Sequence, residues 1–359
     1  MGKSLIPERS FWTGRRVLVT GHTGFKGSWL ALWLARLGAR VTGYALEPSS
    51  PSLFADARVA EVTDSVIGDV RDAERLGEVF TRTQPEVVLH LAAQALVRES
   101  YRDPVETFTT NVVGTAQVLE LVHKTDSVVA AVVVTSDKCY ENREQTRGYR
   151  ESDRLGGRDP YSSSKACAEL VTSAYRESFL AAPEHAALAT ARAGNVVGGG
   201  DWGADRLVPD IVRAALGNEP ARIRNPDAIR PWQHVVEPLW GYLSLVERLC
   251  AGDMTARSAW NFGPSEGGES VRSICDSFSS IWGQPIDWAL DSNPNPHEAQ
   301  LLQLDSAKAR ESLGWEPRLE IEDTLRWTVE WYREFRDGAD ARTLTETQLL
   351  RYEDLVGLT

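Results

Sequence analysis

A tyrosine and a lysine four positions apart are the residues of this sequence best suited to acid-base chemistry. Tyr161 and Lys165 lie in the run DPYSSSKACAE, at the start of a segment with helical periodicity, so both side chains project from one face of the expected helix. A nearby ammonium group favours the phenolate, and we expect it to lower the tyrosine pKa from about 10 toward working pH. Because YxxxK also occurs by chance on ordinary surface helices, its meaning depends on its surroundings.

Three polar residues follow an apolar run upstream of this pair. The run VVAAVVVTS predicts a buried central strand, and Ser136, Asp137 and Lys138 come at its end. A hydroxyl there can hydrogen-bond a substrate oxygen that is being oxidised. The carboxyl group and the amine add an acid and a potential base, which elimination of water requires and plain dehydrogenation does not. An ordinary polar turn after a strand would explain one such charge more readily than two.

A glycine-rich segment near the N-terminus predicts a dinucleotide site. The run RRVLVTGHTGFKGSWLALWL is typical of strand, turn and helix, with Gly21, Gly24 and Gly27 three apart. Glycine permits the tight turn and lets backbone N–H groups approach a pyrophosphate at the positive end of the helix dipole. His22, inside the turn, is interpreted as a loop residue and not as a base. We expect further cofactor contacts from Thr23, Phe25, Lys26, Leu91, Ala92, Ala93, Tyr161 and Lys165.

The end of the second expected strand favours NAD over NADP, because no arginine or lysine follows it directly to receive a 2'-phosphate. The segment GYALEPSS also lacks the aspartate that usually contacts the adenosine ribose, and Glu47 is the nearest substitute. Asp69 and Val70, in IGDVRD, are at the positions where related proteins hold the adenine. The aspartate fits a helix cap equally well.

The elements that must position these residues alternate along the first half of the chain. Short β-branched runs alternate with longer helical runs, which predicts an α/β fold with a doubly wound parallel sheet of the Rossmann type. We expect strands at 16–20, 40–45, 65–67, 87–91, 128–135 and 187–192, and helices at 25–37, 104–123 and 161–180.

Two domains are expected. The first is a cofactor-binding domain over residues 1–194, joined by a returning segment near 232–252. The second is a smaller C-terminal substrate-binding lobe over most of 195–359, where Gly, Pro, Asn and Trp become frequent in irregular segments.

Composition narrows the classes of partner. The 359 residues are 42% hydrophobic and carry a net charge of -12, which predicts a folded chain and disfavours nucleic acid. Since no apolar run approaches the roughly 20 residues that span a bilayer, and no leader is recognisable, we expect a cytoplasmic protein that does not bind membranes. The four cysteines form no CxxC pair and the six histidines show no ligand spacing, so neither disulfides nor a metal site is expected.

Five motifs together give the sequence a specific resemblance. The runs TGHTGFKGSWL, SDKCYEN, YSSSK, RAGNVVGGGDW and IRPWQHV are similar to those of nucleotide-sugar 4,6-dehydratases, in the extended short-chain dehydrogenase/reductase family. The similarity runs from Phe11 to about Trp327. Most of these enzymes carry Thr-Asp-Glu where this sequence has Ser136, Asp137 and Lys138. In having lysine at this position, the sequence resembles the enzymes of the CDP-glucose branch and not those of the dTDP-glucose branch.

The resemblance implies bound NAD, a CDP-hexose substrate and a redox-neutral loss of water. It implies that Tyr161 takes the proton of the C4 hydroxyl as C4 is oxidised. Lys138, or a base that it assists, takes the C5 proton, and protonated Asp137 protonates the departing C6 hydroxyl. A lysine acts as such a base only where desolvation or nearby positive charge lowers its pKa. The resemblance also implies a homodimer, or a tetramer, built on the helices at 104–123 and 161–180.

Substrate contacts are expected from loops after the fourth and sixth strands and from the smaller lobe. Arg230 is the main candidate for the diphosphate, because a guanidinium matches its oxygens in a bidentate manner. Trp232 and Trp202 are expected near the nucleotide, whereas Trp29 and Trp33 are expected in the core. The other expected substrate contacts are Gln94, Arg98, Asn195, Asp201, Arg206, Arg224, His234 and His297.

Three alternatives stay open from the residues alone. A 4-epimerase shares the glycine turn and YxxxK but does not need the acid and base at Asp137 and Lys138. A dehydratase acting on a dTDP- or GDP-hexose would need both, and no single residue identifies the nucleotide base. A silent dinucleotide sensor on the same fold would not need an intact Ser136, Tyr161 and Lys165.

Overall fold

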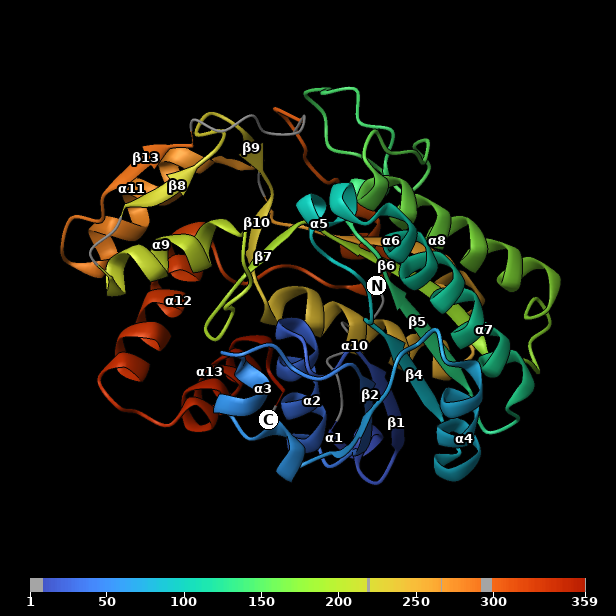
Figure 1. The fold of residues 1–359 in the computed structure, drawn as a ribbon. Coiled ribbons are helices and arrows are strands. Elements are labelled where there is room, and N and C mark those ends of the chain that lie inside the picture. The colour runs from blue at the N-terminus through green and yellow to red at the C-terminus, as the bar shows by residue number, and fades with distance from the viewer. Residues whose placement is uncertain (1–8, 218–219, 266, 292–298, 359) are drawn as a thin grey trace.

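A computed structural model describes residues 9–217, 220–265, 267–291 and 299–358. Its centre is a seven-stranded sheet in the order β11-β6-β5-β4-β1-β2-β3, in which all neighbouring strands are parallel (Figure 1). The strands are β1 (Arg16–Thr20), β2 (Arg40–Ala45), β3 (Asp64–Ile67), β4 (Val87–His90), β5 (Ala130–Val134), β6 (Ala187–Ala193) and β11 (Ala259–Phe262). The doubly wound α/β fold is confirmed, and the first six strands lie within two residues of the expected ones. The seventh was not expected.

Helices cover both faces of the sheet. Val17 and Val19 of β1 pack in one apolar cluster with α2 (Phe25–Arg36) and α10 (Val236–Cys250). Leu18, between them, packs on the opposite face with α4 (Ala73–Thr83) and α7 (Gly114–Lys124). Because both faces are buried, the strands are apolar at consecutive positions and do not alternate.

The two long helices expected at 104–123 and 161–180 lie side by side on the second face (Figure 1). The first consists of α6 (Pro104–Phe108), a π-helical turn over Thr109–Val113, and α7. The second is α8 (Pro160–Ser178), whose N-terminus is capped by Asp159, which accepts a hydrogen bond from the Ser162 amide at 2.8 Å. Proline at the first helical position fits this start, since its missing N–H would have no partner there.

A smaller lobe lies beyond the carboxyl ends of the strands (Figure 1). It contains three short strand pairs: β7 (Asn195–Val197) with β10 (Trp232–His234), β8 (Ala221–Ile223) with β13 (Trp288–Leu290), and β9 (Ile229–Arg230) with β12 (Glu269–Ser270). The remaining helices are α1 (Arg9–Trp12), α3 (Leu53–Asp56), α5 (Val97–Arg102), α9 (Leu207–Leu216), α11 (Val271–Trp282), α12 (Ile321–Arg336) and α13 (Ala341–Val356), with 3-10 turns at Val59–Glu61, Asp137–Cys139 and Met254–Ala256 and a second π-helical turn at Ala309–Leu313.

More of the C-terminal half packs against the sheet and its helices than the sequence indicated. Besides α10 and β11, the last helix, α13, packs against α2, where Glu353 accepts hydrogen bonds from the Trp33 indole at 3.0 Å and from the Arg36 guanidinium. Trp29 and Trp33 are fully buried, as expected for core residues. Within the described ranges, no helix is both long enough and apolar enough to cross a bilayer.

Candidate active site

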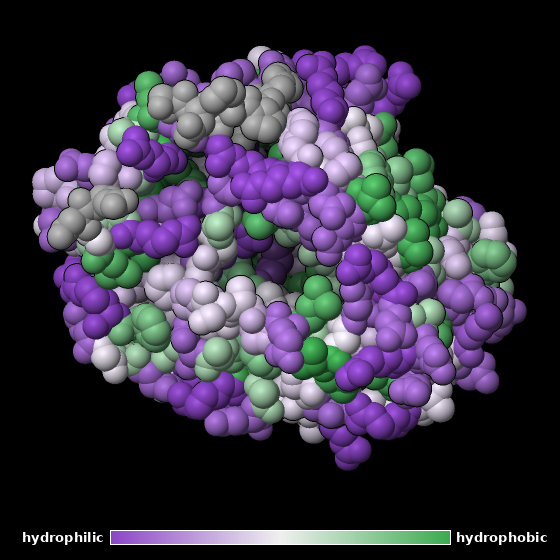
Figure 2. Space-filling view, in the orientation of Figure 1, coloured by the Kyte–Doolittle hydropathy of each residue, from purple (hydrophilic) through white to green (hydrophobic). Residues whose placement is uncertain are grey.

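A cavity of about 640 Å³ lies at the carboxyl ends of the strands, between the sheet and the smaller lobe. The molecular surface is hollowed near the centre of the face in Figure 2. The cavity includes the place where the chain order reverses between β1 and β4, because its walls include the glycine turn after β1 and residues 91–94 after β4. Such a reversal is where open α/β sheets bind their ligands.

The glycine turn fits the diphosphate of a dinucleotide. Gly21 has φ +80°, a conformation that favours glycine, and a Cβ on Gly27 would lie 2.1 Å from the Gly21 carbonyl oxygen. Helix α2 begins after Gly24 with no side-chain cap, which leaves its first N–H groups available at the cavity wall. Thr23, Phe25 and Lys26 line the cavity too, as do Leu91, Ala92 and Ala93. His22 is fully buried with its Nε2 2.7 Å from Ser65 Oγ, and burial lowers its pKa to about 4, so it is not placed as a base.

At the far end of this wall, Asp69 and Val70 line the cavity. Asp69 forms an ion pair with Arg71, whereas the cap of α4 is Asp72, which accepts from the Arg75 amide at 3.0 Å. Of the two interpretations of Asp69, the helix cap is therefore wrong. Glu47 is exposed and does not line the cavity. The suggestion that it replaces the missing aspartate is not supported, because Ala45 and Leu46 form the wall there.

The acid and the base expected after β5 both line the cavity. Ser136 caps the short turn Asp137–Cys139, accepting from the Lys138 amide at 3.2 Å, and its hydroxyl donates to Asp137 Oδ1 at 2.9 Å. Asp137 is 1% exposed, and its Oδ2 has no hydrogen-bond partner among the described residues. Lys138 keeps 30% of its side chain exposed, with Nζ 3.9 Å from Asp137 Oδ1. The turn thus presents a carboxyl oxygen and an amine to the same space.

Tyr161 and Lys165 line the cavity from the first turns of α8. Lys165 Nζ donates to the Val134 carbonyl at the end of β5, at 3.3 Å, which ties the helix to the catalytic strand. Burial lowers the pKa of Lys165 to about 8, with Glu169 acting in the opposite direction.

The expected lowering of the Tyr161 pKa is wrong for the protein without ligands. Burial raises the pKa of Tyr161 to about 12, and the carboxylate of Asp137 adds to the rise. Ser136 and Arg206 act in the opposite direction, but they do not overcome the cost of a buried phenolate beside a carboxylate. The residues around Tyr161 therefore favour its neutral phenol.

Most residues expected to contact substrate also line the cavity: Gln94, Arg98, Asn195, Asp201, Arg206, Arg224 and Arg230, together with Trp232. Two do not. Trp202 packs against Tyr332 and Phe335, and its indole donates to Asp56. His234 is fully buried with its ring edge-on to Trp29 and Trp327. Both expectations are corrected because aromatic packing, and not the cavity, fixes these rings. His297 lies outside the described residues.

The arginines of the cavity differ in how they are held. The Arg230 guanidinium donates to the carbonyls of Ile229, Ala299 and Gln300, so it also fastens the 299–300 segment beside β9. Arg206 pairs with buried Asp201 at 3.0 Å, and that carboxylate raises the Arg206 pKa.

Arg98, on α5, joins the sheet side of the cavity to the lobe. It pairs with Asp205 at 2.8 Å and with Asp291 at 3.2 Å.

Sequence reasoning missed many polar residues of the wall, among them Tyr140, Asn142, Arg158, Asp205, Arg222 and Asn225. Arg222 and Asn225 flank the expected Arg224, so the run RIRN was an available signal. Sequence reasoning also assigned Lys26 to the cofactor alone. Burial, together with nearby Lys165 and Arg206, lowers the Lys26 pKa to about 8, and Lys26 lines the same cavity as Tyr161 and Lys165.

Comparisons with known proteins agree with this geometry. The sequence matches the family model described as GDP-mannose 4,6 dehydratase over residues 18–328. It is 48% identical over 351 residues to the CDP-glucose 4,6-dehydratase of Salmonella typhimurium, covering 96% of this chain and 98% of that relative.

Two solved structures share the fold. The dTDP-glucose 4,6-dehydratase of Bacillus anthracis, in complex with NAD, has a TM-score of 0.76 at 22% identity and covers 90% of this chain and 98% of its own. The UDP-glucose 4-epimerase of Brucella ovis, in complex with NAD, has a TM-score of 0.75 at 25% identity and covers 88% and 97%.

We predict that Gly27→Ala weakens NAD binding roughly tenfold or more, equivalent to about 1.4 kcal/mol. The added Cβ would lie 2.1 Å from the Gly21 carbonyl oxygen and must displace the turn. Titration with NAD, followed by tryptophan fluorescence, measures the affinity. Gly77→Ala, whose Cβ would meet nothing closer than 3.8 Å, is the matched control. Unchanged affinity in a folded Gly27→Ala protein would contradict the role given to the turn.

Proposed function

The chain belongs to the GDP-mannose 4,6 dehydratase family, and from that premise we propose that it is an NAD-dependent lyase that converts CDP-D-glucose into CDP-4-dehydro-6-deoxy-D-glucose and water. The observation that carries the proposal is that Asp137 and Lys138 line the same cavity as Tyr161 and Lys165. The identity with the Salmonella typhimurium relative supports cytidine as the nucleoside.

Bound NAD supplies the oxidant for C4 of the sugar and the hydride that later reaches C6. The residues of the chain move the protons. Tyr161 takes the proton of the C4 hydroxyl, while Ser136 hydrogen-bonds the same oxygen and Lys165 stabilises the phenolate. Because burial raises the pKa of Tyr161, a nearby positive charge is needed to favour its phenolate, and the nicotinamide ring of bound NAD would supply one.

Oxidation at C4 acidifies the C5 proton, and elimination then needs one acceptor and one donor. Lys138 accepts the C5 proton, and protonated Asp137 gives its proton to the C6 hydroxyl, which leaves as water. Return of hydride to C6 and of the proton held by Lys138 to C5 would complete the product. The proton that Tyr161 took from the C4 hydroxyl would restore the acid at Asp137, so the nucleotide sugar loses only water. The buried Asp137 Oδ2 has no hydrogen-bond partner in the part of the chain that the structure describes, which supports the donor role because this oxygen is available to the leaving hydroxyl.

A 4-epimerase is the second candidate, supported by a UDP-glucose 4-epimerase of Halalkalibacterium halodurans at 25% identity. Epimerisation needs oxidation and reduction at C4 but no acid for C6 and no base for C5. The pair at Asp137 and Lys138 would be superfluous in that reaction. The dehydratase is therefore favoured.

Incubation with CDP-, dTDP-, GDP- and UDP-glucose tests the reaction and the nucleotide together. We expect a 4-keto-6-deoxy product from CDP-glucose, with kcat/KM at least roughly tenfold above that for the other nucleotides, equivalent to about 1.4 kcal/mol. If the enzyme prefers a substrate with another base, the proposed nucleoside is wrong but the proposed reaction stands. An interconversion of glucose and galactose derivatives would instead identify an epimerase.

We predict that Lys138→Met separates oxidation from elimination. Because Tyr161 and Lys165 are untouched, addition of substrate should still produce NADH absorbance, whereas the 4-keto-6-deoxy product should fall roughly hundredfold or more without the C5 base. Lys124→Met, which removes an exposed amine paired with Glu120 on α7, is the control and should behave as the unmodified enzyme. Product formation at the normal rate in Lys138→Met would remove Lys138 from the mechanism.

A homodimer through α6, α7 and α8 is part of the proposal. Large apolar side chains are exposed on this surface, including Val105 at 70%, Val113 at 47% and Leu170 at 59%. An apolar patch over α6 and α8 is visible in Figure 2. Contiguous exposed apolar surface of this kind is typical of protein interfaces.

The four cysteines are free, which fits the reducing cytoplasm. The proposed sugar-nucleotide substrate fits a role in deoxysugar biosynthesis.

Sedimentation velocity should find a dimer, or a tetramer that contains it, and Leu170→Asp should shift the protein toward monomer. The carboxylate would have to be buried without a partner in the interface. Leu355→Asp, at a 50% exposed position on α13, should leave the assembly unchanged. An unmodified chain that sediments as a monomer would refute the interface.

A further inference from the structure

A buried polar cluster lies directly behind the catalytic turn. It consists of Thr135, Tyr140, Glu169, Thr190, Arg192 and Asn261, all 5% exposed or less. Strand β5 pairs with β6 up to Val134 and Ala191, so the end of β5 and Arg192 are neighbours in the sheet. The cluster therefore connects the strand that carries the acid and the base to the helix that carries Tyr161 and Lys165.

One arm of the cluster holds α8. Glu169 lies one helical turn beyond Lys165 and accepts hydrogen bonds from the hydroxyls of Thr135 and Thr190. The same carboxylate pairs with Arg192 Nη2 at 2.7 Å. Although burial acts to raise the pKa of Glu169, the Arg192 charge and these hydrogen bonds hold it below its ordinary value, so the ion pair persists. Thr135 precedes Ser136, so this arm sets the separation of Ser136 from the face of α8.

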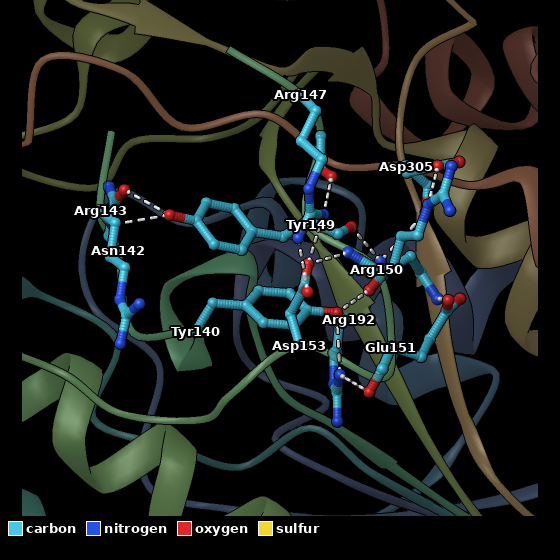
Figure 3. Close-up of polar contacts among 12 residues, drawn as sticks. Tyr140, Asn142, Arg143, Arg147, Tyr149, Arg150, Glu151, Asp153, Arg192 and Asp305 are labelled. Atoms are coloured by element: carbon cyan, nitrogen blue, oxygen red, sulfur yellow. Dashed lines mark hydrogen bonds and ion pairs between the residues drawn. The ribbon is translucent and has the colours of Figure 1, made fainter. Parts of the chain in front are cut away.

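The other arm holds the catalytic turn from its far end. Tyr140 follows Lys138 by two residues, and its hydroxyl accepts from Arg192 Nη1 at 2.8 Å and donates to Asn261 Oδ1 at 2.7 Å. Figure 3 shows the Tyr140 ring stacked on Tyr149 with its hydroxyl directed at the Arg192 guanidinium. Asn261 Nδ2 in turn donates to the Tyr149 carbonyl at 2.7 Å.

Arg192 is the branch point of the two arms, because its two terminal nitrogens are engaged separately. A buried ion pair is weak evidence for stability, since apolar side chains of the same volume are often as stable. What such a cluster does provide is fixed geometry, because each donor and acceptor must keep its place to remain satisfied. Its location between the two halves of the catalytic machinery indicates where that geometry is used.

We propose that Glu169, Arg192 and Tyr140 are positioning residues with divided tasks, the Glu169 arm aligning Tyr161 and Lys165 for oxidation at C4 and the Tyr140 arm aligning Lys138 for proton removal at C5. The inference rests on the proposed function, since it divides the two stages of that reaction. Neither Glu169 nor Arg192 lines the cavity, so both act through other residues.

Tyr140→Phe is the most conservative test, because it removes one hydroxyl and keeps the ring stacked on Tyr149. On mixing with CDP-glucose, NADH absorbance should rise at the normal rate and then accumulate, while product formation slows roughly tenfold to hundredfold through misplacement of Lys138. KM should stay within about twofold of the unmodified value.

Arg192→Lys tests the two arms separately in a second way. One ammonium can keep the pair with Glu169 but cannot also reach Tyr140, so this variant should reproduce the kinetics of Tyr140→Phe. Glu169→Gln should instead slow the appearance of NADH itself, with no accumulation. Thermal unfolding of each variant reports how much of any loss is due to stability.

Tyr352→Phe is the matched control, because Tyr352 is fully buried and its hydroxyl donates to Glu237 at 2.5 Å, away from the cavity. We expect its melting temperature to fall while both reaction stages keep their rates. Equal slowing of both stages in Tyr140→Phe, or no change at all, would overturn the divided roles. If the unmodified enzyme forms neither NADH nor product, the proposed function is wrong, and the inference, which depends on it, is wrong as well.

Discussion

The contact between the end of β5 and the first turns of α8 is the constraint on which the rest of the site depends. Ser136, Asp137 and Lys138 come from the strand, and Tyr161 and Lys165 come from the helix, more than 20 residues later. Only the packing of these two elements determines whether five groups reach one sugar ring. The hydrogen bond from Lys165 to the Val134 carbonyl marks the point where they meet.

Burial then determines how the charges of the site behave. Tyr161 and Lys165 are buried at the wall of a cavity that Lys26 also lines, and burial favours the neutral forms of a phenol and of amines. The pKa of Tyr161 rises to about 12, while those of both buried lysines fall to about 8. Burial thus acts in opposite ways on the protons of the site, because the phenol holds its proton more firmly while the two amines release theirs more readily.

The smaller lobe completes the cavity with arginines that are already engaged within the protein. Arg98 connects the sheet side to Asp205 and Asp291 of the lobe, and Arg230 holds the backbone near residue 300. The orientation of these guanidinium groups is set by carboxylates and carbonyls, which would reduce the entropy lost if a diphosphate binds there. The same preorganisation would allow a strongly acidic chain to bind the anionic substrate that we propose.

Local signals in the sequence were sufficient for the strands β1 to β6 and for placing the glycine turn, Ser136 to Lys138, Tyr161 and Lys165 at one cavity, although most of the other lining residues were not predicted. Each depends on periodicity or spacing within a short window, where backbone geometry dictates which side chains share a face. Tertiary structure alone decided the seventh strand, the packing of Trp202 and His234 against other aromatic rings, and the direction of the Tyr161 pKa shift. The cluster around Arg192 belongs to the same class, since Tyr140 and Asn261 meet across 121 positions. No local pattern encodes such a meeting, because it arises only when separate strands and helices pack together and exclude water from the groups between them.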